Sequence, residues 1–304
     1  MTLAAIRRSF GPFDAGLRVV LALLIASPIV APGFAPGRAA AQVLGLGPSD
    51  SDQPLEIYAN EGIEWRQNEK SYIARGNARA VRGKFSVHAD VLTARYRKVG
   101  RGKTEIWRIE AEGHVRIKSP TESAYADKAV YDIDNGVLVL TGKDLKLITV
   151  KQTITARDSL EYWEKKRMSV ARGEALVVQE DGRLKADILT AHFRKTKDED
   201  TELYLMEAFG NVLVSTPRGI ARGERGVYNV ETAIATLTGS VKITSGNNQL
   251  NGDVAEINLK TGVSRILSAS KTGDKSRPVR ALITPQKPPD KPSEKAKKSE
   301  KIKK

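Results

Sequence analysis

Apolar and polar residues alternate with a period of two along most of this 304-residue chain. The runs VRIK at 115–118, LKLI at 145–148 and VKIT at 241–244 place an apolar side chain at every second position. This is the period of a β-strand, because successive side chains point to opposite faces of a sheet. Glycine, asparagine and aspartate bound these runs, as expected for turns. No stretch after residue 41 has good helical periodicity, so the pattern predicts an all-β protein.

The alternating runs follow glycines at a repeating interval. The glycines are Gly76, Gly113, Gly142, Gly173, Gly210 and Gly239, with spacings of 37, 29, 31, 37 and 29 residues. The cycle therefore restarts after 97 residues, and the near-identical segments ADVLTARYRK (89–98) and ADILTAHFRK (186–195) have the same offset. One unit of this size cannot bury its apolar face alone, so consecutive units are expected to stack around one continuous interior.

Acidic residues recur at one position of the repeat, namely Asp90, Asp127, Asp158, Asp187 and Asp253. A catalytic acid pair is a single pair in a cleft, whereas these acids occur once per unit. We expect them to accept backbone N–H groups where strands begin, as in Asx turns. The histidines His88, His114 and His192 are scattered, so the sequence predicts no metal site, no cofactor and no enzyme.

The two ends of the chain differ in composition from the middle. Residues 1–41 contribute +3 and residues 271–304 contribute +8 to the net charge of +14, which leaves +3 for residues 42–270. A folded nucleic-acid-binding surface is therefore not implied. Arginines precede the apolar run Val19–Ala31, and small residues follow it up to Ala41, as in a secretory signal peptide. An uncleaved membrane anchor is the alternative, although 13 apolar residues are fewer than the roughly 20 of a spanning helix.

These features predict four segments. Residues 1–41 form a signal peptide, 42–54 a linker, 55–270 the β repeats, and 271–304 a disordered tail rich in Lys and Pro. The expected location is outside the cytoplasm, with an inner-membrane anchor as the open alternative.

The repeat resembles the OstA-like repeats of the LptA family. The segment GNARAVRGKFSVHADVLTARY (76–96), with its echoes at GHVRI and GNVLV, has the rhythm of that family, and the likeness covers about Leu55 to Leu267. The resemblance implies an elongated, partly open β-jelly roll (a "β-taco") and a periplasmic bridge. That bridge would pass lipopolysaccharide from the inner to the outer membrane while shielding the lipid A acyl chains. The chain departs from the family in its length and its Lys-rich tail.

The groove that the resemblance implies would be lined by the alternating apolar positions. The expected residues are Val87, Leu92, Val115, Ile117, Val139, Leu145, Leu147, Leu189, Val212, Val214, Val241 and Ile243. Lys118, Lys146 and Lys242 are candidate rim contacts for lipid A phosphates. Periodicity assigns these residues to a face but leaves open whether that face holds lipid or sealed core.

Unpaired strands at the ends of the stack would join a neighbour by strand addition. We expect head-to-tail self-association, and pairing with transport components of both membranes, through Leu55–Arg66 at one end and Leu250–Leu259 at the other. Three alternatives remain open: an LptC-like subunit with an uncleaved N-terminal helix, a structural β-solenoid that binds no lipid, and a carbohydrate-active β-helix enzyme.

Overall fold

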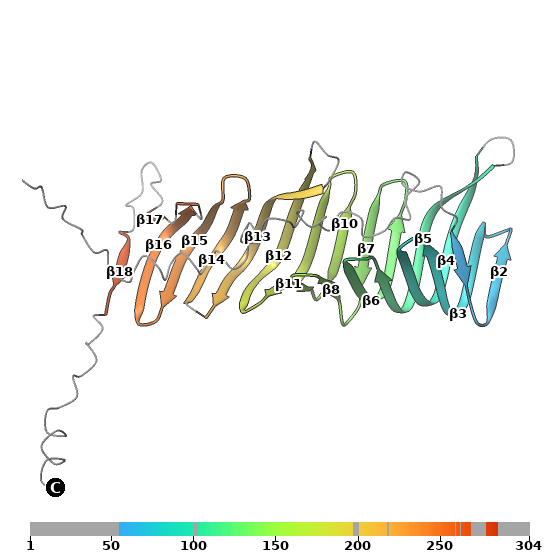
Figure 1. Cartoon of the computed structure of the whole chain (residues 1–304), viewed down its shortest axis with the longest axis horizontal. Helices are drawn as coiled ribbons and strands as arrows, with labels where there is room; N and C mark the ends of the chain where they lie inside the picture. Colours follow the sequence, from blue (N-terminus) through green and yellow to red (C-terminus); the bar gives the residue numbers. More distant parts are fainter. Residues whose placement is uncertain are drawn as a thin grey trace, which may run out of the picture.

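The computed structural model describes residues 55–99, 103–196, 201–217, 219–258, 260–261, 263–268 and 278–284. Within these ranges the chain forms strands and turns, and it contains no helix that could cross a membrane. The strands lie side by side in an elongated stack that extends from β2 to β18 (Figure 1). The predicted all-β fold of stacked units is confirmed.

The described residues form one sheet of 18 strands. In chain order the strands are β1 (Glu56–Tyr58), β2 (Gly62–Arg66), β3 (Ser71–Arg82), β4 (Phe85–Val99), β5 (Lys103–Lys118), β6 (Glu122–Asp132), β7 (Val137–Thr141), β8 (Lys146–Thr149), β9 (Thr153–Thr155), β10 (Ser159–Trp163), β11 (Met168–Gln179), β12 (Gly182–Lys195), β13 (Thr201–Thr216), β14 (Gly219–Asn229), β15 (Ile234–Ser245), β16 (Asn248–Asn258), β17 (Ser264–Leu267) and β18 (Arg280–Leu282).

Neighbouring strands are antiparallel throughout, and most follow one another along the chain. Some long strands pair on one side with two short strands instead of one. β3 pairs with β1 and β2, β6 with β7 and β8, β11 with β9 and β10, and β16 with β17 and β18. Each pair of short strands therefore occupies the place of one long strand that is interrupted in the middle.

The strand bounds repeat with the spacing seen in the sequence. Adding 97 to β3 (Ser71–Arg82) gives β11 (Met168–Gln179), and adding 97 to β6 gives β14 (Glu122–Asp132 and Gly219–Asn229). The short strands β1 and β2 map in the same way onto β9 and β10. The duplicated segments thus occupy equivalent places in one continuous sheet.

A line of β-bulges crosses the middle of the long strands. Gly113 (φ 77°) and the following His114 (φ 47°) both have left-handed backbone conformations, and the register between β5 and its neighbours shifts there. Gly210 and Asn211 in β13 repeat this geometry. Bulges of this kind bend a strand and increase its twist, so the sheet folds along this line. We call the line the corner.

The recurrent acids face the corner glycines. A Cβ on Gly113 would lie 2.1 Å from Oδ2 of Asp90, and one on Gly210 would lie 2.2 Å from Oδ2 of Asp187. Glycine is therefore required both for its positive φ and for the space that the acid occupies.

The prediction that these acids cap strand starts is wrong for Asp90 and Asp187, which lie within β4 and β12. Their carboxylates contact side chains across the bulge: Asp90 contacts His114 Nδ1 at 2.8 Å, and Asp187 accepts from Asn211 Nδ2 at 2.9 Å. Asp127 does accept a backbone N–H, from Lys143. The recurring residue type was visible in the sequence, but its partner depends on strand register.

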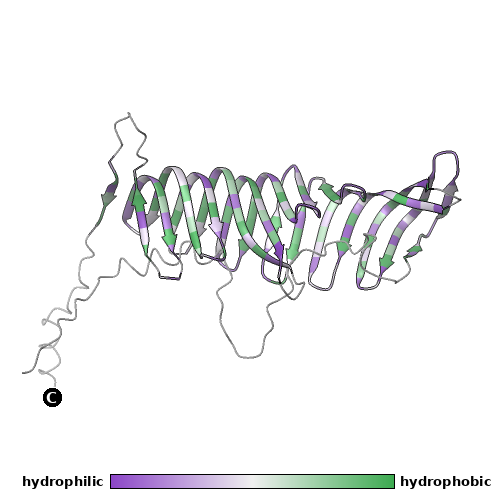
Figure 2. Cartoon of the chain, turned by 90° about the horizontal axis from the view of Figure 1, so that it is seen from above, coloured by the Kyte–Doolittle hydropathy of each residue, from purple (hydrophilic) through white to green (hydrophobic). Residues whose placement is uncertain are grey.

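The corner divides the sheet into two half-sheets. The first half-sheet contains β2, β7, β10 and β17, and the second contains β1, β8, β9 and β18, each with the arms of the long strands that pair with them. Figure 2 shows apolar and polar positions alternating along the strands. One cluster of buried side chains draws on both half-sheets, so their apolar faces point toward each other.

Small residues line the inside of the corner. Ala78 faces Ala89 across β3 and β4, and Ala175 faces Ala186 across β11 and β12, with all four buried. Alanine lets the two half-sheets meet closely at the fold and leaves little side-chain volume to fill the space above it.

Two predictions about the C-terminal region are corrected. Residues 250–258 belong to β16, which is covered on one side by β17 and β18, so β16 is not the end of the sheet. Arg280–Leu282 forms β18, although residues 271–304 were expected to be a disordered tail. Pairing with the β16 backbone, from Gln249 to Asn251, explains this strand. The predicted signal peptide, the linker and residues 285–304 lie outside the described residues.

Candidate functional site

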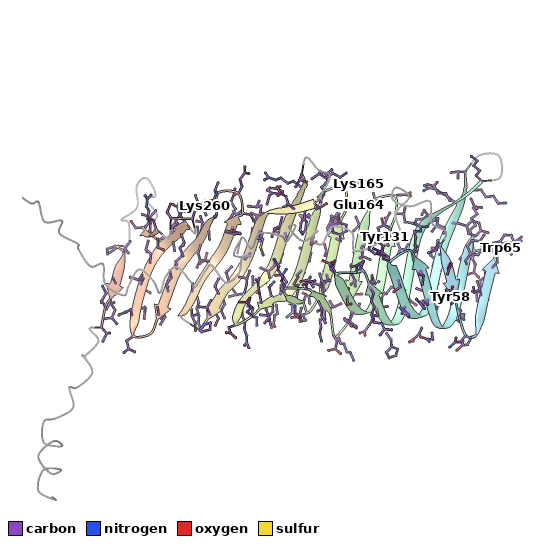
Figure 3. All side chains as sticks on the ribbon, viewed as in Figure 1. Tyr58, Trp65, Tyr131, Glu164, Lys165 and Lys260 are labelled. Atoms are coloured by element: carbon purple, nitrogen blue, oxygen red, sulfur yellow. The ribbon has the colours of Figure 1, made fainter. Side chains whose placement is uncertain are left out.

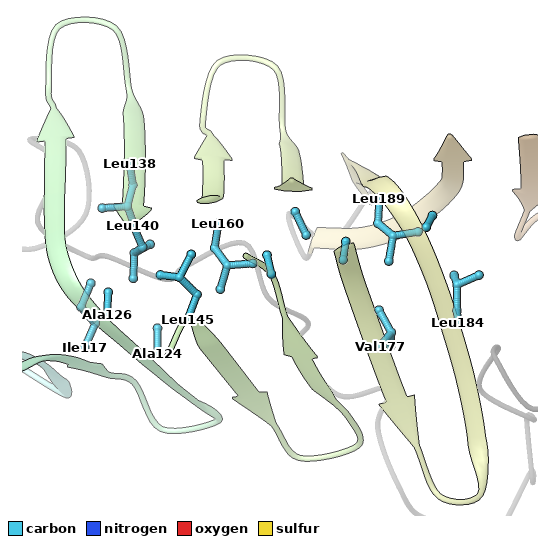
Figure 4. Close-up of a cluster of buried hydrophobic side chains, with 14 of the residues drawn as sticks. Ile117, Ala124, Ala126, Leu138, Leu140, Leu145, Leu160, Val177, Leu184 and Leu189 are labelled. Atoms are coloured by element: carbon cyan, nitrogen blue, oxygen red, sulfur yellow. The ribbon is translucent and has the colours of Figure 1, made fainter. Parts of the chain in front are cut away.

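The predicted groove residues gather on the inner side of the two half-sheets, with one exception. Those that are buried in the shared apolar cluster are Val87, Leu92, Val115, Ile117, Leu145, Leu189, Val212, Val214, Val241 and Ile243. Leu147 is half-buried and packs against the same cluster. Figure 4 shows the central part of this cluster, where Ile117, Leu145 and Leu189 lie among residues of both half-sheets.

Val139 is the exception, and its predicted place on the inner face is wrong. It is half-buried between Val130 and Glu161 of the neighbouring strands, on the outer face. Leu138 and Leu140, which flank it, are 1% and 4% exposed and belong to the inner cluster. The run VLVLT is apolar at four successive positions, so alternation alone could not assign the face.

A cavity of about 620 Å³, open to solvent, lies between the half-sheets near the middle of the stack. Leu147, Ile154 and Val177 line it from the second half-sheet, and Leu138 and Tyr162 line it from the first. The predicted Leu189 also contributes. The space between the half-sheets is therefore not completely filled by side chains.

A second open cavity, of about 510 Å³, lies between β12 and β15. The predicted Val212 and Val214 line it together with Leu184, Met206 and Tyr228. Sequence reasoning missed the last three. Alternation along β12 and β13 could have identified Leu184 and Met206 as inward-facing residues. The inward position of Tyr228 was recognised only from the structure.

Three tyrosines lie along the inner side of the first half-sheet near the strand ends. Burial raises the pKa of Tyr131, Tyr162 and Tyr228, that of Tyr162 to about 12. Tyr131 donates a hydrogen bond of 3.0 Å to Glu164, with both residues labelled in Figure 3. All three rings stay neutral at ordinary pH and place hydroxyl groups beside an apolar surface, as tyrosines do where an apolar region borders on water.

The inner face of the second half-sheet also carries a carboxyl group. Glu122 is 8% exposed and precedes Ala124 and Ala126 on the buried face of β6. Burial raises the pKa of its side chain. The residue lies at the strand end, where its N–H donates to Ser119 Oγ.

The three candidate rim lysines lie on one face of the second half-sheet. Lys118, Lys146 and Lys242 are exposed on its outer face, alternating with inward residues. The histidines also stay apart: His114 contacts Asp90, His192 contacts Glu207, and His88 lies near Arg116. Within the described ranges no three metal-binding side chains converge.

The two ends of the sheet expose apolar side chains. At one end β1 and β2, within Leu55–Arg66, pair with β3 and with no other described strand. Tyr58 and Trp65 there are 53% and 58% exposed (Figure 3). Trp65 stacks on Tyr72 and donates a hydrogen bond to Tyr96. At the other end, Leu282 and Ile283 are 56% and 60% exposed.

Comparison with known proteins gives the following matches. The family model described as LptA/(LptD N-terminal domain) LPS transport protein matches twice, at residues 56–158 and 153–263. An uncharacterized protein of Rhizobium meliloti (strain 1021) is 29% identical over 101 residues, which are 32% of this chain. The chain spans 54% of the length of that relative. LptH of Pseudomonas aeruginosa, described as the LptA homologous periplasmic component of the lipopolysaccharide transport device, matches with a TM-score of 0.37 and 18% identity over 44% of this chain and 95% of LptH.

Proposed function

Because this chain belongs to the family of LPS transport proteins that comprises LptA and the N-terminal domain of LptD, we propose that it is a periplasmic carrier of lipopolysaccharide. In this proposal the lipid A acyl chains lie between the two half-sheets, and the chain forms part of a bridge between the inner and the outer membrane.

The observation that carries the proposal is the pair of open apolar cavities between the half-sheets. Both cavities are lined mainly by apolar side chains and are open to solvent, as expected for a site that receives acyl chains. Each buried CH₂ contributes about 0.8 kcal/mol, so an acyl chain of about 14 carbons would cost on the order of 10 kcal/mol to expose to water. Apolar residues at equivalent places in successive strands offer such a chain similar surroundings along the stack.

The ends of the sheet support assembly into a longer structure. Following the antiparallel pairs along the sheet, β17 and β18 run opposite to β1 and β2. A second copy in the same orientation would therefore set its β1–β2 edge antiparallel against the β17–β18 edge. Backbone groups at both edges that have no partner among the described strands, together with exposed apolar side chains, favour such a joint, with a further copy or with membrane-bound transport components.

The proposal is tested by photocrosslinking at two residues of β13 that face opposite sides of the sheet. A photoreactive amino acid replaces Val214, which is buried and lines the second cavity, or Leu205, which is half-buried on the outer face of the first half-sheet. With lipopolysaccharide and the purified full chain, we expect a lipid adduct at position 214 and little or none at 205. Absence of an adduct at 214, and at another inward position such as Leu189, would support a sealed β-solenoid instead.

A further inference from the structure

Strand register brings basic residues into one cross-strand row on the outer face of the second half-sheet. In the first part of the sheet, Arg79 lies opposite His88, His88 opposite Arg116, Arg116 opposite Tyr125, and Tyr125 opposite Lys146. These residues come from β3, β4, β5, β6 and β8, and they are neighbours only because of the pairing.

The same row continues without a break to the other end. Lys146 lies opposite Thr155, Thr155 opposite Leu176, and Leu176 opposite Lys185. Lys185 in turn lies opposite Leu213, and Leu213 lies opposite Arg222. From Arg222 the row passes to Lys242, Asn251 and Arg280. No acidic residue occupies this row between Arg79 and Arg280. We call these residues the basic row.

Most cations of the basic row have no partner within the described part of the chain. No ion pair or side-chain hydrogen bond is formed there by Arg79, Arg116, Lys146, Arg222 or Lys242, whereas Lys185 pairs with Glu174 at 3.0 Å. The Nε atom of Arg116 is buried without a hydrogen-bond partner. The pKa of His88 is lowered by its burial and then by Arg116, Arg79 and Lys118, as expected beside concentrated positive charge.

The outer face of the first half-sheet is organised differently. There, glutamates occupy one cross-strand row and are paired: Glu110 with Arg95 and Arg108, and Glu207 with Arg225 and His192. Positive charge is therefore neutralised within the fold on one half-sheet and left available on the other.

The acids of the corner, which border the basic row, have partners of their own. Asp90 contacts His114, Asp187 accepts from Asn211, and Asp158 pairs with Arg157. These contacts compensate part of the negative charge beside the row, so an anion has cations to bind on this face.

The basic row runs parallel to the groove on the outer face of the second half-sheet, between the corner and the hairpin turns. The corner closes one side of the fold, so the mouth lies between the two rows of hairpin turns opposite the corner. On β8, Lys146 is three residues from the strand end at Thr149, or roughly 10 Å at about 3.3 Å per residue. A head group that emerges from the mouth reaches the row by folding over the hairpins of the second half-sheet and extending along its outer face by this distance.

We propose that the basic row binds the phosphate groups of the glycolipid whose acyl chains lie in the groove; this inference rests on the proposed function. The cations recur along the whole sheet, which suits a ligand that occupies or passes successive positions of the groove. Acyl chains would then be held by burial, and the head group by charge-assisted hydrogen bonds.

The test uses the purified full chain and two probes, bisphosphorylated lipid A and the same lipid with its phosphates removed. A row variant carries Arg79→Gln, Arg116→Gln, Arg222→Gln and Lys242→Gln. A control variant removes the same charge from the first half-sheet, where the cations are exposed and paired: Arg66→Gln, Arg75→Gln, Arg97→Gln and Lys128→Gln. Circular dichroism checks that each variant is folded, and equilibrium binding is measured at low and at physiological salt.

We expect the wild-type protein and the control to bind the phosphorylated lipid about tenfold or more tightly than the dephosphorylated one, since one or two charge-assisted contacts supply that much. The row variant should lose this preference while its affinity for the dephosphorylated lipid is unchanged. Retention of the preference by the row variant overturns the inference and leaves the groove intact. Failure of the wild type to bind either lipid overturns the proposed function and the inference with it. Equal affinity for inorganic polyphosphate and for phosphorylated lipid overturns the head-group assignment.

Discussion

The corner is the feature on which the folded shape of the sheet depends, and Gly113→Ala tests it. Gly113 has a φ of 77°, and a Cβ there would come 2.1 Å from Asp90 Oδ2. The left-handed conformation costs an L residue about 1–2 kcal/mol. Displacing the acid and adjoining backbone adds about 1–3 kcal/mol, the usual range for overpacking. We expect a total loss of about 2–5 kcal/mol in the free energy of unfolding.

Gly246→Ala is the matched control, because Gly246 has a φ of 55° and no atom within 4 Å of its Cβ position. This control should lose only the conformational part, about 1–2 kcal/mol. Urea unfolding of both variants measures the difference, and adding Asp90→Ala to Gly113→Ala should recover the steric part. Equal losses for Gly113→Ala and Gly246→Ala would refute the proposed contact at the corner.

Three further predictions concern the inner face and the ends. Leu138→Ala should reduce the free energy of unfolding by about 2–5 kcal/mol, and Val139→Ala should reduce it by clearly less, because of the two only Leu138 is buried in the cluster. Similar losses for both variants in urea unfolding would contradict the assignment of Leu138 to the inner face and Val139 to the outer face. Burial raises the pKa of Glu122, so the folded state favours the protonated acid, and stability falls as pH rises through the ordinary value of 4.5 toward the folded-state pKa. Glu122→Gln should therefore be more stable than the wild type at neutral pH, with a difference that disappears in acid; a difference independent of pH would show that ionisation is not the cause. Trp65→Lys or Leu282→Lys should weaken concentration-dependent association in analytical ultracentrifugation, whereas Val150→Lys, at an exposed turn residue between β8 and β9, should not. An equal effect of Val150→Lys would argue against association through the edges.

The sequence predicted the strands and most of the inner face because both depend on local alternation. Ile117, Leu189 and Val214 are buried where a period of two placed them. Val139 was misassigned because its neighbours are also apolar, so the run contains no alternation to read.

Features that depend on pairing between strands could not be predicted. The contact between Asp90 and Gly113, and the alignment of Arg79 with Arg116 through His88, follow from the register of β3, β4 and β5. The strand at Arg280–Leu282 was missed because its few apolar residues stand in a segment rich in Lys and Pro, and the strand is stabilised by backbone pairing with β16. The cavities arise from the distance between half-sheets, which no single strand encodes.

The central claim is that acyl chains occupy the space between the half-sheets, and native mass spectrometry with lipid A tests it most directly. Met206 is half-buried and lines the second cavity, so Met206→Trp should fill part of that space, whereas Leu205→Trp adds the same ring on the outer face of the first half-sheet. The account predicts a lipid-bound mass for the wild type and for Leu205→Trp, and a reduced bound fraction for Met206→Trp. A folded wild-type chain that shows no lipid-bound mass, or equal bound fractions in all three proteins, would contradict it.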